Sequence, residues 1–276
     1  MANIPMHRGI GLTALLIGIS RAADWGWNSA PTLGLSAVGL VVLVLFGLFE
    51  HRTPHPLVNM RTFVRRAVLT TNVSTVLIGS AMISTFMLVP LLAQAGGETG
   101  FGLSATEAGL LLAPGGLLSL LIAPIVGRIG ERSGSKTPFF AGCLVTASAL
   151  LGMALAHDSV GLVVLWSCIA SVGVGAAFAS IPNLIVVAVD EHQTGEATGV
   201  NTVMRNIGSA VGAQVAGTII ATHVLASGLT ANTGFTIAFL VSAIGAVIAG
   251  LSVLLIPGRP NQQTAAEPDV QPALAA

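Results

Sequence analysis

The stretch from 127 to 136, GRIGERSGSK, gathers side chains that could do chemistry in a chain that otherwise has few of them. One acid among three bases can form a small cluster of ion pairs, and the three glycines of the stretch allow two backbones to approach closely. The stretch therefore predicts a tight, charged turn between two apolar segments. Charged residues form 8% of the whole sequence and hydrophobic residues 53%, yet four positions here are charged: Arg128, Glu131, Arg132 and Lys136.

A further charged residue, Arg205, lies about ten residues inside an apolar segment. A charge at that depth in a membrane costs from ~2.5 to more than ~10 kcal/mol, so it is usually paired or faces a cavity. Asn201 and Ser209 lie four positions to either side and share its helix face. Two interpretations stay open: a structural arginine that reaches helix carbonyls, and a functional one. Gly208 and Gly212 form a GxxxG pattern, which is typical of close packing between membrane helices.

Polar residues within two other apolar segments are candidates for the lining of a cavity. The segment 67–93 begins with several hydroxyl and amide side chains, and the segment 160–189 contains a proline that can free a helix carbonyl. Helices interrupted in this way commonly line transporter sites. The alternative is that the hydroxyls only satisfy helix carbonyls and the proline makes a passive kink. The candidates are Asn72, Thr75, Ser84, Pro182 and Asn183.

No pattern typical of an enzyme active site or a metal centre occurs in the sequence. Cys143 and Cys168 lie inside apolar segments, and there is neither a CxxC nor a Cys/His cluster. A nucleotide-binding loop and a nucleophile elbow are also absent. The histidines fall in loops or at segment ends, so most are expected to be solvated. The net charge is zero, and we expect no enzyme activity, no cofactor, no metal and no nucleic-acid partner.

Eight apolar segments follow one another along the chain, and most are close to the roughly 20 residues that a membrane-spanning helix needs. A backbone in lipid must satisfy its hydrogen bonds internally, so these segments should be helices. The sequence predicts an all-α transmembrane fold with about eight spanning helices. The first segment also fits a signal peptide, because it has a basic start and a short apolar core. The segments are 9–23, 31–49, 67–93, 105–127, 138–156, 160–189, 195–222 and 234–256.

Three local signals predict where helices begin. Ser104 and Glu107 have the spacing of a capping box. Thr137 followed by Pro138 predicts an N-cap and a first-turn proline. Glu196 falls in the first turn of the segment 195–222, where a carboxylate favours the helix dipole.

Basic residues predict the orientation in the membrane, because cytoplasmic loops carry an excess of lysine and arginine. If the N-terminus is cytoplasmic, the outer loops carry at most Arg21, at the edge of a segment. Both termini are then cytoplasmic. The inner segments carry Arg8, Arg52, Arg61, Arg65, Arg66, Arg128, Arg132, Lys136 and Arg259.

The spacing within GRIGERSGSK resembles the signature loop of the major facilitator superfamily. That pattern is a glycine, three residues, an acid, a base, one residue, a glycine, one residue and a base. The family usually has Asp where this chain has Glu131. The resemblance implies that the motif latches one half of a transporter against the other in one conformation. The matching residues are Gly127, Glu131, Arg132, Gly134 and Lys136.

Three other stretches resemble the fourteen-span drug/proton antiporters of this superfamily, the EmrB/QacA type. EHRTPHPLVNMRTFVRR at 50–66 resembles the basic link before their last six spans, and LSATEAGLLLAPGG at 103–116 resembles the entry to the following span. GEATGVNTVMRNIGSAVG at 195–212 resembles their next-to-last span, including its arginine. The resemblance implies that this helix lies where the two halves meet. It bears Asn201, Arg205, Gly208 and Gly212.

The resemblance also implies how the chain is organised. Two linker helices and the cytoplasmic link would occupy 1–66, a six-helix C-terminal bundle 67–257, and a disordered cytoplasmic tail 258–276. Fourteen-span members carry six further spans ahead of this region, so we expect a C-terminal half that is incomplete without an N-terminal half. The helix bearing Arg205 would otherwise present its glycines to lipid. A separately encoded half, or a second copy of the chain, is the expected partner.

The activity that the resemblance implies is secondary transport in the inner membrane. The bilayer surrounds the protein, and the substrates would be small amphipathic or cationic molecules exported by proton antiport. No carboxylate lies deep in any apolar segment, so the protonation site is expected outside this region. The alternatives are a membrane scaffold or assembly subunit that transports nothing, and a non-functional gene remnant.

Overall fold

The computed structural model describes residues 64–96, 99–224 and 231–256, together with scattered positions between 29 and 45. The predicted linker segments 9–23 and 31–49 lie largely outside the described residues, and the tail 258–276 lies wholly outside them. The division of the chain into linker, bundle and tail therefore stays a prediction.

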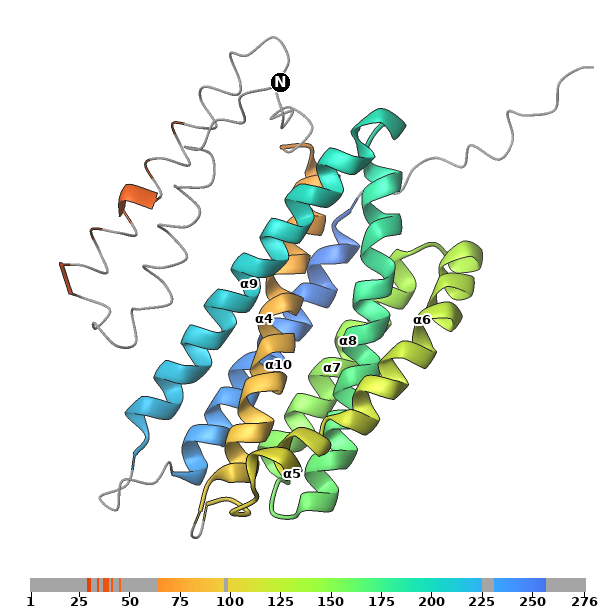
Figure 1. Cartoon of the computed structure of the whole chain (residues 1–276). Helices are drawn as coiled ribbons and strands as arrows, with labels where there is room; N and C mark the ends of the chain where they lie inside the picture. Colours follow the sequence, from red (N-terminus) through yellow and green to blue (C-terminus); the bar gives the residue numbers. More distant parts are fainter. Residues whose placement is uncertain are drawn as a thin grey trace, which may run out of the picture.

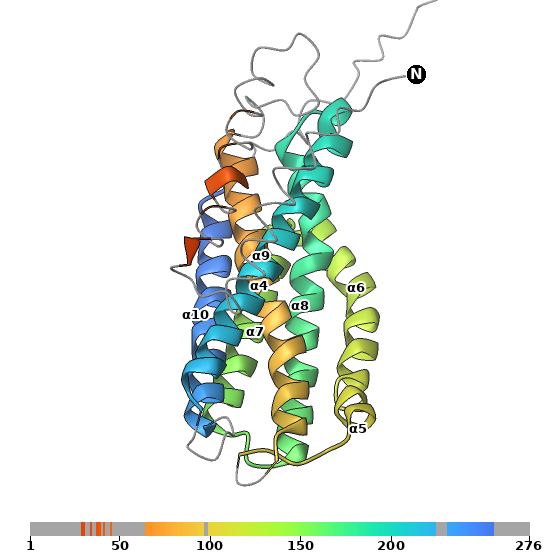
Figure 2. The same ribbon diagram turned by 60° about the vertical axis from the view of Figure 1, so that its left-hand side comes forward.

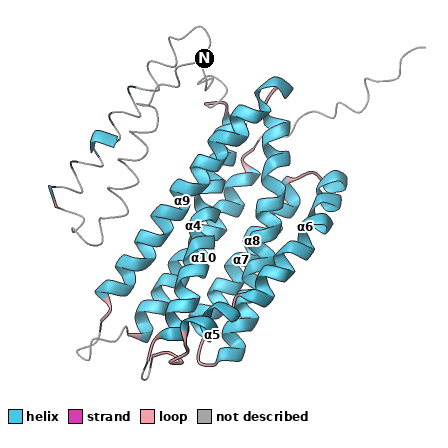
Figure 3. Ribbon diagram, in the orientation of Figure 1, coloured by secondary structure: helices cyan, strands magenta, loops and turns pink. Residues whose placement is uncertain are grey.

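Within the described residues from 64 onward, all regular elements are helices and none is an extended strand (Figure 3). The six apolar segments predicted from residue 67 onward all form helices. At most of their ends, the observed bounds lie within two residues of the predicted ones. The elements are α4 (Arg66–Gln94), α5 (Ala105–Leu110), α6 (Ala113–Ser133), α7 (Lys136–Leu155), α8 (Val160–Ala188), the 3-10 turn η1 (Glu191–Gln193), α9 (Thr194–Thr222) and α10 (Asn232–Leu254).

Five helical segments in the described part are long and apolar enough to cross a membrane. They are α4, α7, α8, α10 and the combined stretch Ala105–Ser133. Helix α9 has 29 residues, like α4 and α8, but its polar residues leave it outside this set. The all-α transmembrane fold is thus confirmed, with α9 as a long helix of distinctly more polar character.

The long helices run alternately up and down and pack as one bundle (Figures 1 and 2). Helix α7 packs mainly on α8 and α10, and α9 packs mainly on α4. Helix α4 also contacts α10 and α8, and α6 lies at the edge of the bundle against α8. Helices α9, α4 and α8 thus meet at one side of the bundle.

The core is built from large apolar side chains and from close contacts between small ones. Phe139 of α7 and Phe235 and Phe239 of α10 are fully buried. Where α7 crosses α8, a Cβ atom on Gly142 would come within 2.6 Å of the Gly173 carbonyl oxygen. Only glycine at both positions permits this approach, which brings the two helices together along their length.

The outer surface is unusually apolar, above all on α6. Leu117, Leu120 and Leu121 are 66%, 72% and 65% exposed. A contiguous apolar surface of this kind would drive association in water. In a bilayer it faces lipid tails at no cost, so the exposed leucines agree with a membrane-embedded bundle.

The structure confirms two of the three predictions about helix ends and corrects the third. The capping box of Ser104 and Glu107 is present, with the Ser104 backbone N–H donating to the Glu107 carboxylate at 2.9 Å. Glu196 lies in the first turn of α9, as predicted. The predicted N-cap at Thr137 is wrong, because α7 already begins at Lys136 and the Thr137 hydroxyl donates to the Ser133 carbonyl at 3.3 Å.

Candidate functional site

Asn201 of α9 lies at the centre of a buried polar cluster that joins α9 to α4. Its amide nitrogen Nδ2 donates to Asn72 Oδ1 at 2.8 Å and to Thr75 Oγ1 at 2.9 Å. All three residues are at most 5% exposed. Asn72 and Thr75 therefore connect two helices, and a role for them in lining a cavity stays a prediction. Buried polar side chains of α4 are favourable at this position because α9 supplies a hydrogen-bond partner for them.

The glycines of the GxxxG pattern lie on the same side of α9, against α4. A Cβ atom on Gly208 would come within 2.1 Å of the Val76 carbonyl oxygen, and one on Gly212 within 2.6 Å of the Ser80 backbone. Both glycines are buried. The expectation that this glycine face would meet lipid is wrong, since α4 already covers it.

Arg205 lies between these two contacts and turns toward α8. Its guanidinium carbon Cζ is 5.6 Å from the centroid of the Phe178 ring, a cation–π contact. Among the described residues, no carboxylate lies within ion-pair distance of Arg205. At about 1.5 Å per residue, its Cα is roughly 17 Å along α9 from the start of the helix, and the residue is half-buried.

A pocket of about 130 Å³ opens between α8 and α9 beside Arg205. One wall is apolar and comes from α8, while the other is polar and comes from α9. The pocket is lined by Phe178, Ile181, Pro182, Ile185, Thr198, Asn201, Thr202 and Arg205.

The remaining candidates for cavity lining have different surroundings. Ser84 is buried and donates its hydroxyl to the Ser80 carbonyl at 2.9 Å, so it satisfies its own helix. Asn183 is exposed on α8 and lies near Gly130, with its amide 4.0 Å from where a Cβ of Gly130 would be. Of the predicted set only Pro182 contributes to the pocket.

A polar stripe along α9 was not recognised from the sequence. Thr198, Thr202 and Asn206 are exposed, although they belong to a helix that lies within a membrane bundle. The two threonine hydroxyls donate to carbonyls of their own helix, at 2.8 and 3.0 Å. Their spacing of four residues was the available signal, because it places them on one face of a helix.

The charged motif at 127–136 is mostly helical. Helix α6 continues to Ser133, and the chain reverses at Gly134, whose φ of 77° favours glycine. The predicted turn is therefore much shorter than the motif. Lys136 Nζ donates to the Ile256 carbonyl beyond the end of α10. Glu131 and Arg132 are exposed, and neither makes an ion pair within the described part of the chain, so the expected charge cluster is not formed here.

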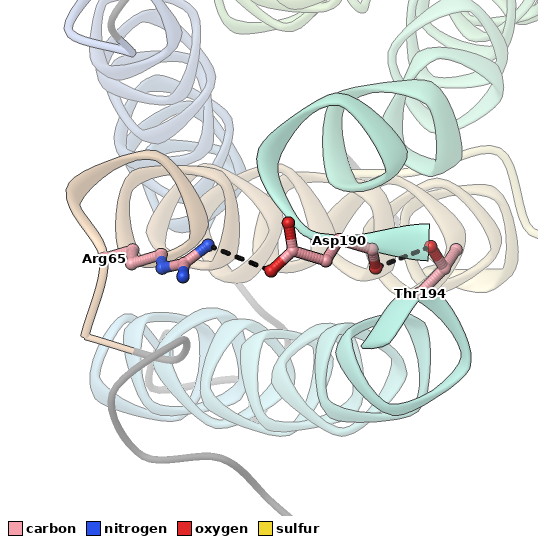
Figure 4. A network of polar contacts seen from close by, with 3 residues as sticks. All are labelled: Arg65, Asp190 and Thr194. Atoms are coloured by element: carbon pink, nitrogen blue, oxygen red, sulfur yellow. Dashed lines mark hydrogen bonds and ion pairs between the residues drawn. The ribbon is translucent and has the colours of Figure 1, made fainter. Parts of the chain in front are cut away.

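At this same end of the bundle, the start of α4 contacts the α8–α9 connection (Figure 4). The sequence did not predict this contact. Arg65 Nη1 lies 3.8 Å from Asp190 Oδ2, and the Thr194 hydroxyl donates to the Asp190 carbonyl at 3.5 Å. Both charged side chains are about half exposed. Such a pair contributes little to stability, roughly 0–1 kcal/mol, but it links the starts of α4 and α9.

At the opposite end, His157 is buried and is an exception to the expectation that most histidines are solvated. Its Nδ1 bonds to the Met153 carbonyl at 2.6 Å, and its Nε2 bonds to the Asn232 side chain. The ring lies 6.2 Å from that of Phe239. The histidine thereby ties the end of α7 to the start of α10. Within the described ranges, no group of histidines, cysteines and acids could hold a metal ion.

A sequence profile of the Major Facilitator Superfamily matches residues 6–213. The chain belongs to the major facilitator superfamily. This assigns the bundle to a family of membrane transporters. Arg205 and the residues that line the pocket beside it lie within the matched residues.

Individual relatives within the superfamily agree with this assignment. An uncharacterised MFS-type transporter of Bacillus subtilis, YcnB, is 26% identical over 262 residues, which are 92% of this chain and 55% of that protein. The tetracenomycin C resistance and export protein of Streptomyces glaucescens is 27% identical over 212 residues, 76% of this chain and 39% of that protein. The chain thus spans about half the length of these relatives, or less.

The bundle also matches a solved transporter structure in fold. A POT family transporter in complex with 5-aminolevulinic acid aligns with a TM-score of 0.58 at 15% identity, covering 90% of this chain and 47% of that one. At this identity the likeness concerns the fold alone.

Proposed function

We propose that the described helices are the C-terminal six-helix half of an exporter of the fourteen-span drug/proton antiporter type. Its substrates would be small amphipathic organic molecules, and it would act without covalent catalysis and without a cofactor. The relatives support the substrate class, since one of them is named for resistance to and export of tetracenomycin C.

The observation that carries this proposal is the pocket between α8 and α9 with its charged and polar wall. Ionisable residues in membrane helices usually face a bundle interior or a water-filled cavity. Arg205 is such a residue, and the exposed Thr198 and Thr202 extend the polar wall on the same helix. A face of this kind is unfavourable against lipid tails but suits a wall of a substrate pathway.

Transport by alternating access requires two bundles that rock around a site at their interface. The six-helix bundle described here would supply one of them, and a second six-helix bundle would supply the other. The membrane scaffold is the less favoured alternative, because the superfamily consists of transporters and a scaffold does not require a polar pocket within the bundle.

Proton coupling would depend on residues outside the described helices. Glu107 and Glu196 lie in first helical turns, and Glu131 is exposed near the end of α6. Within the described ranges, no acid lies deep in a long helix. We therefore assign the protonation site of this proposal to the opposing bundle.

The end of the bundle that carries the basic residues would be cytoplasmic, in the inner membrane. Arg65, Arg128, Arg132 and Lys136 all lie where α4 and α7 begin and α6 ends. The connections at the other end of the bundle contain no lysine or arginine. The positive-inside rule then favours a cytoplasmic location for the basic end and for both termini.

The experiment is drug efflux in a pump-deficient host. The chain is expressed alone and together with the N-terminal six-span half of a close relative, at membrane levels matched by immunoblot. We expect proton-dependent efflux only for the combination. No efflux from either, at equal membrane levels, would contradict the transporter proposal, whereas efflux from the chain alone would point to a functional homodimer.

A further inference from the structure

The α8–α9 pocket is too small for a whole drug-sized molecule but large enough for its polar group. Its volume is about 130 Å³, whereas sites that enclose such ligands measure roughly 300–1,000 Å³. The pocket is partly open, so the body of a ligand could extend from it along the exposed face of α9. The side chains that line it should therefore recognise one functional group.

The charge of the pocket comes from Arg205 alone. The nearest acid along α9 is Glu196, nine positions earlier, which corresponds to roughly 14 Å of helix. Phe178 contacts the guanidinium through its ring, but a ring does not neutralise a charge. A half-buried guanidinium on a membrane helix, without a carboxylate among the described residues to pair with it, is suited to an anionic ligand.

Two neutral groups at the pocket could orient such a ligand. The hydrogen bonds of Asn201 to α4 both use its amide nitrogen, which leaves its amide oxygen as an acceptor. Pro182 has no N–H, so the carbonyl of Phe178 lacks its usual helical donor. Both acceptors favour a ligand that carries a hydroxyl or N–H donor near its anionic group.

We propose that the α8–α9 pocket binds the anionic group of an acidic amphipathic molecule, a carboxylate or a phenolate on an aromatic body, with Arg205 as its counter-ion. Phe178, Ile181 and Ile185 provide an apolar wall for the part of the ring next to the anionic group, and the rest of the aromatic body extends out of the pocket. This inference rests on the proposed export function and narrows its substrates, since the pocket would disfavour organic cations.

The test is binding of three probes of equal shape to the purified chain in lipid nanodiscs, without a proton gradient. The probes are 2-naphthoate, neutral 2-naphthamide and cationic 2-naphthylmethylammonium, measured by equilibrium dialysis. One charge-assisted hydrogen bond should make naphthoate bind roughly tenfold more tightly than the amide. The cation should bind most weakly.

Three variants assign the preference to the pocket. R205Q should abolish the preference for naphthoate while leaving the amide affinity within about twofold. R205K should retain part of it, because the charge remains but the planar fork is lost. R66Q is the matched control, since it removes the same charge from the exposed start of α4 and should leave the preference unchanged.

Equal affinity of the wild-type chain for all three probes, tighter binding of the cation, or no binding of naphthoate would each overturn the anionic site. The same holds if R205Q and R66Q reduce the preference equally. Circular dichroism and gel filtration show whether R205Q folds. If it does not, the affinities of the wild-type chain and of R205K for the three probes still decide whether the pocket prefers an anion. Efflux is measured separately, so failure of the anionic site and failure of the export proposal can be told apart.

Discussion

Gly208 of α9 lies directly against Val76 of α4, so closely that a Cβ at position 208 would come within 2.1 Å of the Val76 carbonyl oxygen. The two helices therefore meet backbone to backbone. This contact holds α9 in the register that places Arg205 beside α8 and Asn201 beside Asn72.

Replacement of this glycine should separate α9 from α4. We expect Gly208→Ala to destabilise the bundle by about 1–3 kcal/mol, because backbone atoms cannot move aside as a flexible side chain can. The measurement is thermal unfolding in detergent, followed by a thiol-reactive dye that labels the buried Cys143 on unfolding. Gly199→Ala is the control, since nothing lies within 4 Å of a Cβ there. Equal melting temperatures for both variants would show that α9 does not pack as described.

The hydrogen bond between Asn201 and Asn72 should stabilise the bundle only when both amides are present. In a cycle of Asn72→Ala, Asn201→Ala and the double variant, we expect a coupling free energy of about 0.6 kcal/mol, the average found between membrane helices, and at most about 1.7 kcal/mol. Asn206→Ala, on the exposed side of α9, should have little effect. Strict additivity of the two single variants would mean that the amides do not interact.

His157 should matter for stability although it lies far from the pocket. His157→Leu leaves the Met153 carbonyl and the Asn232 side chain without their partner, which costs about 1–3 kcal/mol for each buried group left unsatisfied. The melting temperature in detergent should fall by several degrees, at roughly 2–4 °C per kcal/mol. His192→Leu, at an exposed position in η1, should melt like the wild type. A similar loss in both variants would contradict a specific role for the buried ring.

Glu131 should affect transport more than folding. It is exposed at the end of α6 and has no ion-pair partner in the described part of the chain, so we expect its role to be a contact that forms in one conformation of the complete transporter. Glu131→Gln should lower the efflux rate at an unchanged membrane level, and Glu131→Asp should be nearly silent. If the level falls and the rate per molecule does not, the residue serves folding.

The proposed orientation predicts which end of the bundle is accessible from each side. With Cys143 and Cys168 replaced by alanine, single cysteines are placed at Ser133 and at Thr106, both of which are exposed. An impermeant thiol reagent added to whole cells should label only the cysteine at position 106. Labelling of position 133 from outside, or of both positions equally, would overturn the orientation.

The helices of this protein were largely predictable from the sequence because a spanning helix depends on local properties. A run of about 20 apolar residues, a capping box at Ser104–Glu107 and an acid at Glu196 each act within a few residues, so α4 and α7 to α10 were found with nearly their observed bounds. One polar face of α9 was visible in the same way, since Asn201, Arg205 and Ser209 recur at helical spacing, whereas the exposed stripe of Thr198, Thr202 and Asn206 was not recognised.

Only the tertiary structure decided what those side chains contact. Asn201 meets Asn72, 129 positions earlier, and Gly208 meets Val76, because α9 packs on α4 and not on another helix or on lipid. Helical periodicity determines which residues share a face, but it carries no information about the partner of that face. Arg205 thus became part of a pocket only when the packing of α9 on α4 brought it beside Phe178 of α8.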